Sequence, residues 1–163
     1  MMRPMFVEFP DDRACEPLDR QFMMGDSLLA APIFKESGEV EYYLPEGEWV
    51  NILTGETVTG GKWQKEKHGY LTMPLLVRPN TILAVGSCDA KPDYEFFDGV
   101  TLKLSVFEEG GEAYTEITDV KGKTVMTAKA VRIGDTISLH VEGGNGNWKY
   151  EVLGSQDVKV VVE

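Results

Sequence analysis

The sequence is short of cysteine and histidine, and both shortages argue against metal or redox chemistry. The two cysteines, Cys15 and Cys88, lie far apart and match no metal-binding or redox spacing. The two histidines, His68 and His140, leave too few ligands for a zinc site. We therefore expect no metal and no cofactor. The thiols are expected to be reduced, which fits a cytoplasmic protein.

Basic residues are scarce as well. Lysine and arginine number 16 against 27 acidic residues, which gives a net charge of −11. Because affinity for nucleic acid comes mainly from cations that neutralise phosphates, this balance argues against nucleic acid, and equally against an anionic membrane surface. A neutral carbohydrate ligand is unaffected by the charge. No apolar run is long enough to span a bilayer and no secretory signal opens the chain, so we expect a soluble, cytoplasmic protein.

The motifs of the common hydrolases and nucleotide-binding enzymes are missing. No serine has the glycine flanks of a nucleophile elbow, and the glycine clusters are typical of hairpin turns rather than phosphate-binding loops. Glycosidases use two carboxylates, so the adjacent acids Asp11-Asp12 and Glu108-Glu109 are the pairs to consider. Neighbouring side chains on a strand point to opposite faces, and one strand alone cannot build such a site. Both pairs are therefore predicted to lie in turns, loops or caps.

What the sequence does contain is a long series of short β signals. Alternating or continuous apolar runs are separated by glycine-rich turns at intervals of about 8–12 residues, which favours a β-sandwich or barrel. The predicted strands cover residues 27–34, 40–44, 48–52, 57–59, 62–66, 70–73, 81–85, 102–107, 113–118, 124–131, 136–141, 148–153 and 158–162. A polar connector at residues 87–93 predicts two small antiparallel β-sandwich domains, 26–88 and 89–163. A single larger sandwich is the alternative.

Residues 1–25 have a different pattern. An apolar stretch at residues 1–9 is followed by a predicted short helix at residues 16–24, with Pro17 in its first turn and Gly25 as its stop. So short a segment cannot bury its own apolar face. We expect its exposed patch to favour oligomerisation, disorder or packing onto the β-domains.

Three tryptophans are the candidate carbohydrate contacts. Trp49, Trp63 and Trp148 each lie on a predicted strand or its edge, where an indole could stack against a sugar ring. Tryptophans in β-rich domains more often fill a core or an interface, and that alternative applies to each of them.

Several motifs together resemble those of glycoside hydrolase family 31. They are RPMFVEFPDD at residues 3–12, LDRQFMMGD at residues 18–26 and LLAAPIF at residues 28–34. YLPEGEW at residues 43–49 is typical of the first β-domain after the family's barrel. WQKEKHGYL at residues 63–71 and PDY at residues 92–94 are similar to the α-xylosidase branch.

The resemblance implies a place in the family's architecture. Residues 1–25 would be the last strand and short helix of a (β/α)8 barrel, and the remainder would be the C-terminal β-domains of a retaining α-xylosidase-like enzyme that cleaves terminal α-xylosyl or α-glucosyl bonds. The family's nucleophile and acid/base aspartates lie in earlier motifs that do not occur here, so no catalytic residue is carried over. The implied partner is the catalytic barrel, with a homo-oligomer through the apolar N-terminal segment as a further possibility. A stand-alone carbohydrate-binding module and a purely structural domain are the alternative functions.

Overall fold

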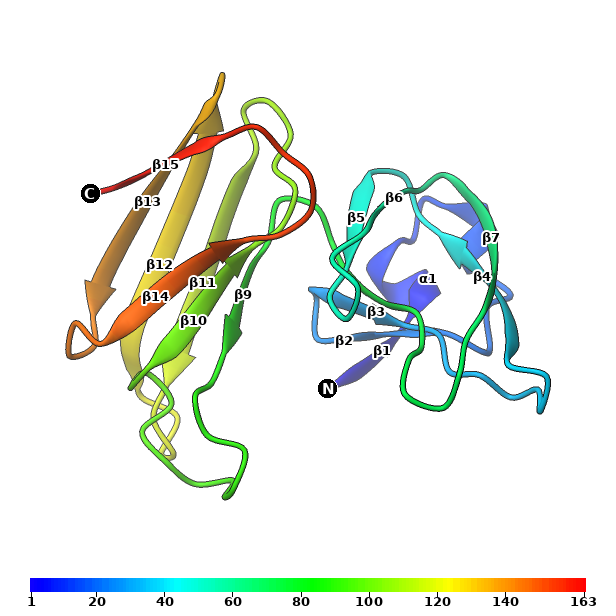
Figure 1. The fold of residues 1–163 in the computed structure, drawn as a ribbon, viewed down its shortest axis with the longest axis horizontal. Coiled ribbons are helices and arrows are strands. Elements are labelled where there is room, and N and C mark those ends of the chain that lie inside the picture. The colour runs from blue at the N-terminus through cyan, green and yellow to red at the C-terminus, as the bar shows by residue number, and fades with distance from the viewer. The chain divides into compact units, whose positions relative to one another are not determined.

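The computed structural model describes residues 1–163 and divides them into two compact units, Met1–Pro79 and Asn80–Glu163. Each unit is built almost entirely of short strands (Figure 1), and the only helical elements are α1 (Met5–Glu8) and the 3₁₀ turn η1 (Arg13–Cys15). The predicted all-β class is confirmed.

The first unit contains a six-stranded and a two-stranded sheet. The larger sheet has the order β1-β2-β3-β8-β5-β6, and every neighbouring pair is antiparallel. Its strands are β1 (Met2–Pro4), β2 (Phe22–Met24), β3 (Leu28–Ala30), β8 (Leu75–Val77), β5 (Glu48–Asn51) and β6 (Thr57–Thr59). The smaller sheet pairs β4 (Glu39–Leu44) with β7 (Lys62–Lys67).

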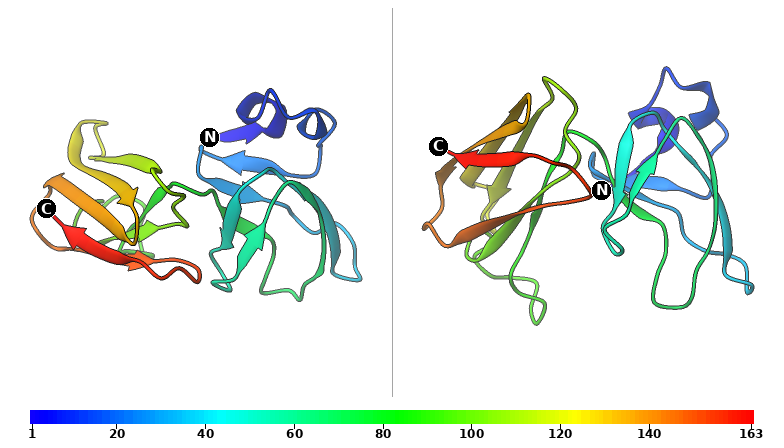
Figure 2. Two further views of the ribbon diagram at one scale, coloured as in Figure 1. Left: turned by 90° about the horizontal axis from the view of Figure 1, so that it is seen from above. Right: turned by 45° about the horizontal axis from the view of Figure 1, so that its top comes forward.

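The N-terminal segment is part of this unit rather than a tail without a partner. Met5 of α1, Cys15 of η1 and Met23 of β2 are fully buried in one core with Trp49 and Leu76. Figure 2 shows α1 beside the strands of the larger sheet. Packing onto the β-domain, one of the three expected outcomes, is observed, because burying these three side chains removes apolar surface from water.

The predicted helix at residues 16–24 is wrong. Its last three residues form strand β2, which lies between β1 and β3. The side-chain amide of Gln21 donates to the Tyr43 carbonyl oxygen (2.7 Å) and accepts from the Tyr43 backbone N–H (2.8 Å), which holds this part of the chain extended. Sheet pairing on both sides outweighs the local helical pattern.

The second unit is a β-sandwich. One sheet has the order β14-β10-β9 and the other β11-β12-β13-β15. The strands are β9 (Ile82–Val85), β10 (Val100–Leu104), β11 (Glu112–Thr118), β12 (Thr124–Ile133), β13 (Thr136–Gly143), β14 (Trp148–Val152) and β15 (Lys159–Val162). Alternate residues of both sheets face one core, with Leu102 and Leu104 from the first sheet and Ala128, Ala130 and Leu139 from the second. This is the period of two that the sequence displays.

Two strand pairs of the sandwich are parallel, although an antiparallel fold was expected. β10 pairs with β14, and β13 pairs with β15, in parallel. Parallel neighbours need a crossover connection, and here strands of the opposite sheet provide it: β14 lies in the chain between β13 and β15, and β11, β12 and β13 lie between β10 and β14.

Other differences concern single strands and the division of the chain. The predicted strand at residues 70–73 is absent, and Tyr70 and Leu71 are almost fully exposed. β8 was not predicted. β9, which the sequence placed in the first β-domain, pairs with β10 in the second unit. Along the chain, the boundary between the compact units falls between Pro79 and Asn80 rather than near residue 88.

Candidate functional site

The three tryptophans have different environments. Trp49 on β5 is 0% exposed, and its indole Nε1–H donates to the Pro45 carbonyl oxygen at 2.9 Å. It has no surface with which to contact a dissolved sugar. Trp63 on β7 is 54% exposed and meets the Tyr43 ring edge-on, with centroids 5.8 Å apart. Trp148, in the second unit, packs against the sandwich core.

The acid pairs hold local structure. One carboxylate oxygen of Asp12 accepts from the Ala14 backbone N–H at 3.0 Å and so caps η1. The other accepts from the Tyr43 hydroxyl at 2.9 Å. In the second unit both carboxylate oxygens of Glu109 accept from the Gly134 backbone N–H, at 3.1 and 3.0 Å. Neither interaction resembles the facing carboxylates of a glycosidase site.

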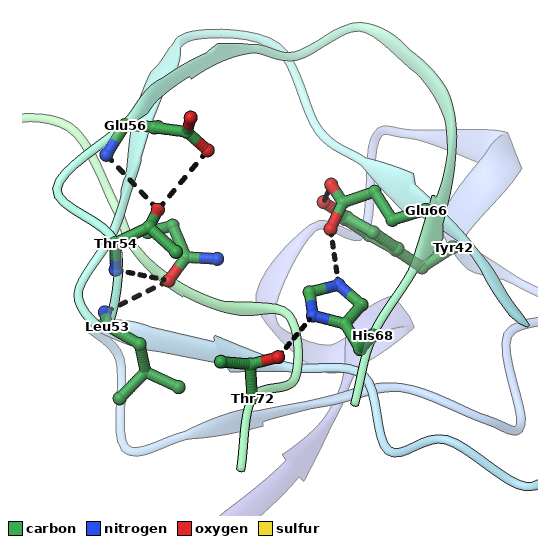
Figure 3. Close-up of polar contacts among 8 residues, drawn as sticks. Tyr42, Leu53, Thr54, Glu56, Glu66, His68 and Thr72 are labelled. Atoms are coloured by element: carbon green, nitrogen blue, oxygen red, sulfur yellow. Dashed lines mark hydrogen bonds and ion pairs between the residues drawn. The ribbon is translucent and has the colours of Figure 1, made fainter. Parts of the chain in front are cut away.

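A chain of polar side chains crosses the smaller sheet of the first unit. The buried Tyr42 hydroxyl donates to Glu66 Oε1 at 2.6 Å, and His68 Nε2 lies 2.7 Å from Glu66 Oε2. His68 Nδ1 lies 3.1 Å from the Thr72 hydroxyl. Figure 3 shows the imidazole between Glu66 and Thr72. Because an ionised carboxylate only accepts, Nε2 is the donor to Glu66.

No motif in the sequence links His68 with Glu66. The signal was present in the alternation of β7. Residues 66 and 68 are two apart and therefore face the same side of an extended chain. What the pattern could not supply was Tyr42, which comes from the partner strand β4 opposite Gln64.

Burial and nearby carboxylates raise the pKa of both tyrosines of β4. For Tyr42 the larger cause is burial and the second is its hydrogen bond to Glu66. For Tyr43 burial and the hydrogen bond to Asp12 raise the pKa to about 12. Both groups therefore hold their protons more tightly in the folded chain than in the unfolded chain.

This difference predicts alkaline unfolding of the first unit. An unfolded tyrosine ionises near pH 10, so the contribution of Tyr42 and Tyr43 is fully present below about pH 10 and is lost as the pH rises toward their folded values. Urea unfolding midpoints measured between about pH 8 and pH 12 should fall above pH 10, and the fall should be shallower in Tyr42→Phe. Tyr114→Phe, an exposed tyrosine of the second unit, is the control. Equal slopes in Tyr42→Phe and the native chain would contradict the assignment.

A second polar cluster fastens the N-terminal segment to the end of β8. The Glu8 carboxylate accepts from Arg3 at 3.0 Å and from Arg78 at 2.7 Å. The Arg78 guanidinium also lies over the Phe9 ring, 4.7 Å from its centroid. A carboxylate between two guanidinium groups joins β1, α1 and the region after β8 into one body.

Several apolar side chains of the N-terminal segment are exposed, and together we call them the N-terminal apolar patch. It consists of Met1, Met2, Phe6, Val7 and Met24, with exposed fractions from 48% to 99%. Met2 and Met24 are opposite each other on β1 and β2, and β1 is the edge strand of its sheet. Exposed apolar side chains on an edge strand are typical of an interaction surface.

The structure contains no group of three or more histidine, cysteine, aspartate or glutamate side chains placed to hold a metal ion. None of its helices has the length and apolar character needed to cross a membrane.

Two protein-family models match the chain. Residues 1–83 match the glycosyl hydrolase family 31 C-terminal domain, and residues 95–163 match the C-terminal domain of alpha-xylosidase YicI.

Curated relatives and solved structures agree with these matches. The chain is 39% identical over 161 residues to an alpha-xylosidase of Emericella nidulans and 31% identical over 150 residues to alpha-xylosidase XylQ of Lactiplantibacillus pentosus. Each alignment covers 90% of this chain and 20% of the relative, so the chain spans about a fifth of their length. A cycloalternan-forming enzyme from Listeria monocytogenes, solved with a pentasaccharide substrate, has a TM-score of 0.70 and 28% identity, covering 81% of this chain and 13% of that chain.

Proposed function

This chain belongs to glycoside hydrolase family 31, and from that premise we propose that it is the non-catalytic C-terminal region of an α-xylosidase-like enzyme. The observation that carries the proposal is the pair of family matches, both to C-terminal domains, which together include most of the chain. The resemblance to the α-xylosidase branch is confirmed by two alpha-xylosidases that are 39% and 31% identical to it.

The side chains of this chain support a scaffold role rather than chemistry. A retaining glycosidase needs a nucleophile and an acid/base carboxylate about 5–5.5 Å apart. Asp12 and Glu109 are each engaged in capping or turn contacts. The first unit also has a pocket between its loops at residues 32–38 and 68–73, and Glu36 is the single carboxylate in its lining. We therefore assign bond cleavage to aspartates outside these residues, acting through a covalent xylosyl intermediate.

We propose that this chain supports the catalytic barrel through the N-terminal apolar patch. Phe6 and Val7 are half exposed on α1, directly after the edge strand β1. Covering them with a catalytic barrel would remove apolar surface from water and extend the contact already made by Met5 inside the unit. In the isolated chain the same patch favours self-association. We also propose a cytoplasmic location, which the free thiols of Cys15 and Cys88 support.

The proposal predicts how this chain behaves alone and in a chimera. The purified chain should not hydrolyse p-nitrophenyl α-xyloside. The Emericella nidulans alpha-xylosidase should lose activity when its matching C-terminal fifth is deleted, and should regain it when this chain is fused in that place. The physical reason is that the barrel needs its apolar contact surface covered in order to stay folded.

Variants of the chimera test the contact itself. Phe6→Asp with Val7→Asp places two charges in the proposed interface and should abolish the recovered activity. Ile133→Asp, at a residue 73% exposed on β12 of the second unit, is the matched control and should leave activity unchanged. Two results would overturn the proposal: turnover by the isolated chain that disappears when one of its own acids is replaced, or a soluble, folded chimera without α-xylosidase activity.

A further inference from the structure

The first unit contains a pocket of about 320 Å³ between two loops. One loop leads from β3 to β4 and the other from β7 to β8. Backbone hydrogen bonds close the space at both ends: the Ala31 N–H donates to the Pro74 carbonyl oxygen at 3.1 Å, and the His68 N–H donates to the Gly38 carbonyl oxygen at 3.0 Å. Between these two hydrogen bonds the two loops separate. The pocket is therefore bounded at both ends by backbone hydrogen bonds between its two loops.

Two features keep the walls in place. Gly38 has a positive φ of 77°, and a Cβ atom there would collide with the His68 backbone carbonyl, so glycine permits the close approach of the two loops. On the other side, the His68 imidazole spans from Glu66 to Thr72 and fastens the base of the second loop (Figure 3). Pockets that bind small ligands are largely pre-formed in this way.

The lining combines apolar, polar and aromatic side chains. Pro32, Ile33 and Met73 provide the apolar surface. The hydroxyl-, ammonium- and carboxylate-bearing side chains come mainly from the first loop, with Lys35, Glu36 and Ser37, and the aromatic ring comes from Tyr70 in the second loop. Tyr70 has its whole side chain in solvent.

We propose that this pocket binds one pyranose unit of a neutral saccharide. Its volume lies at the small end of the range for ligand pockets, which suits a single sugar ring. The apolar side chains of the lining and the Tyr70 ring match the C–H face of a sugar, and the lining offers Glu36 as an acceptor and Lys35 as a donor for hydroxyl groups. The lining has one cation, Lys35, and one anion, Glu36, so it attracts neither a cationic nor an anionic ligand. The net charge of −11 further disfavours anions. This binding role is independent of the scaffold function proposed above.

The test is a titration of the complete chain followed by amide NMR. The probes are methyl α-D-xylopyranoside and methyl α-D-glucopyranoside, each raised through the millimolar range. We expect saturable shifts at residues 32–38 and 68–73, and the stronger probe identifies the preferred sugar. Tyr70→Ala should weaken binding about two- to tenfold, the size of a lost aromatic contact. Glu36→Gln should weaken it several-fold, because a charged acceptor becomes a neutral one.

Two controls separate this site from other surfaces. Leu71→Ala removes an equally exposed apolar neighbour that does not line the pocket, and Tyr114→Ala removes an exposed tyrosine of the second unit. Both should bind like the native chain. The proposal is overturned if neither glycoside gives saturable shifts, if the shifts centre on Trp63 or Trp148, or if Leu71→Ala weakens binding as much as Tyr70→Ala. Should Tyr70→Ala not fold, an unchanged affinity in Glu36→Gln overturns it.

Discussion

Replacing Trp49 with alanine is expected to lower the free energy of unfolding of the first unit by about 4 kcal/mol. The indole is fully buried, its ring lies 6.2 Å from that of Phe9, and its N–H is bonded to the Pro45 carbonyl oxygen. The substitution therefore leaves both a large cavity and a carbonyl without its donor. Urea unfolding followed through the amide signals of β5 and β8 measures the loss.

Trp63→Ala is the matched control on the same unit. Trp63 is half exposed and loses mainly its edge-on contact with Tyr43, so we expect a cost of at most about 1.5 kcal/mol. Equal losses in the two variants would show that Trp49 is not a core residue in solution.

Gly60→Ala is expected to have the second largest effect, about 3 kcal/mol of lost stability in the same unit. A Cβ atom at residue 60 would be driven into the Pro45 carbonyl group, the group that accepts the Trp49 indole N–H. The Gly60 backbone N–H also donates to the Gly47 carbonyl oxygen at 2.8 Å, so the loop cannot move away without breaking this bond. Thermal unfolding of the variant should show a clearly lower midpoint.

Gly61→Ala, at the neighbouring residue, is the comparison for Gly60→Ala. Gly61 has a positive φ of 74° but open space where a Cβ would lie. Gly61→Ala therefore brings only the backbone cost of about 1–2 kcal/mol for a left-handed conformation. If Gly61→Ala proves the more harmful of the two, the close contact between Gly60 and Pro45 does not exist in solution.

Gly60 and Gly61 illustrate which structural features a sequence pattern can and cannot predict. The predicted strand at residues 57–59 agrees with β6, and Gly60-Gly61 connects it to β7. Nothing in the pattern distinguished the two residues. The difference depends on Pro45, which approaches from another part of the chain, and only the folded unit shows that approach.

The candidate sites likewise differ in what the sequence pattern indicated and what only the folded structure shows. The three tryptophans were recognised from their residue type, but burial removes Trp49 from any contact with a ligand. The pocket went unrecognised, because its two loops are about 30 residues apart and carry no shared motif. Tyr70 was assigned to a strand on local pattern, whereas the structure places it in an exposed loop.

The sequence alone determined the all-β class, most strands of the second unit and the family, because period-two alternation, turn glycines and motif residues are local properties of the chain. Tertiary structure decided whether residues 22–24 became helix or strand, and which strands run parallel. It also decided that Met5, Cys15 and Met23 are buried. Each of these outcomes depends on a partner distant in sequence, and the free energy gained from pairing and burial with that partner exceeds the small local preference.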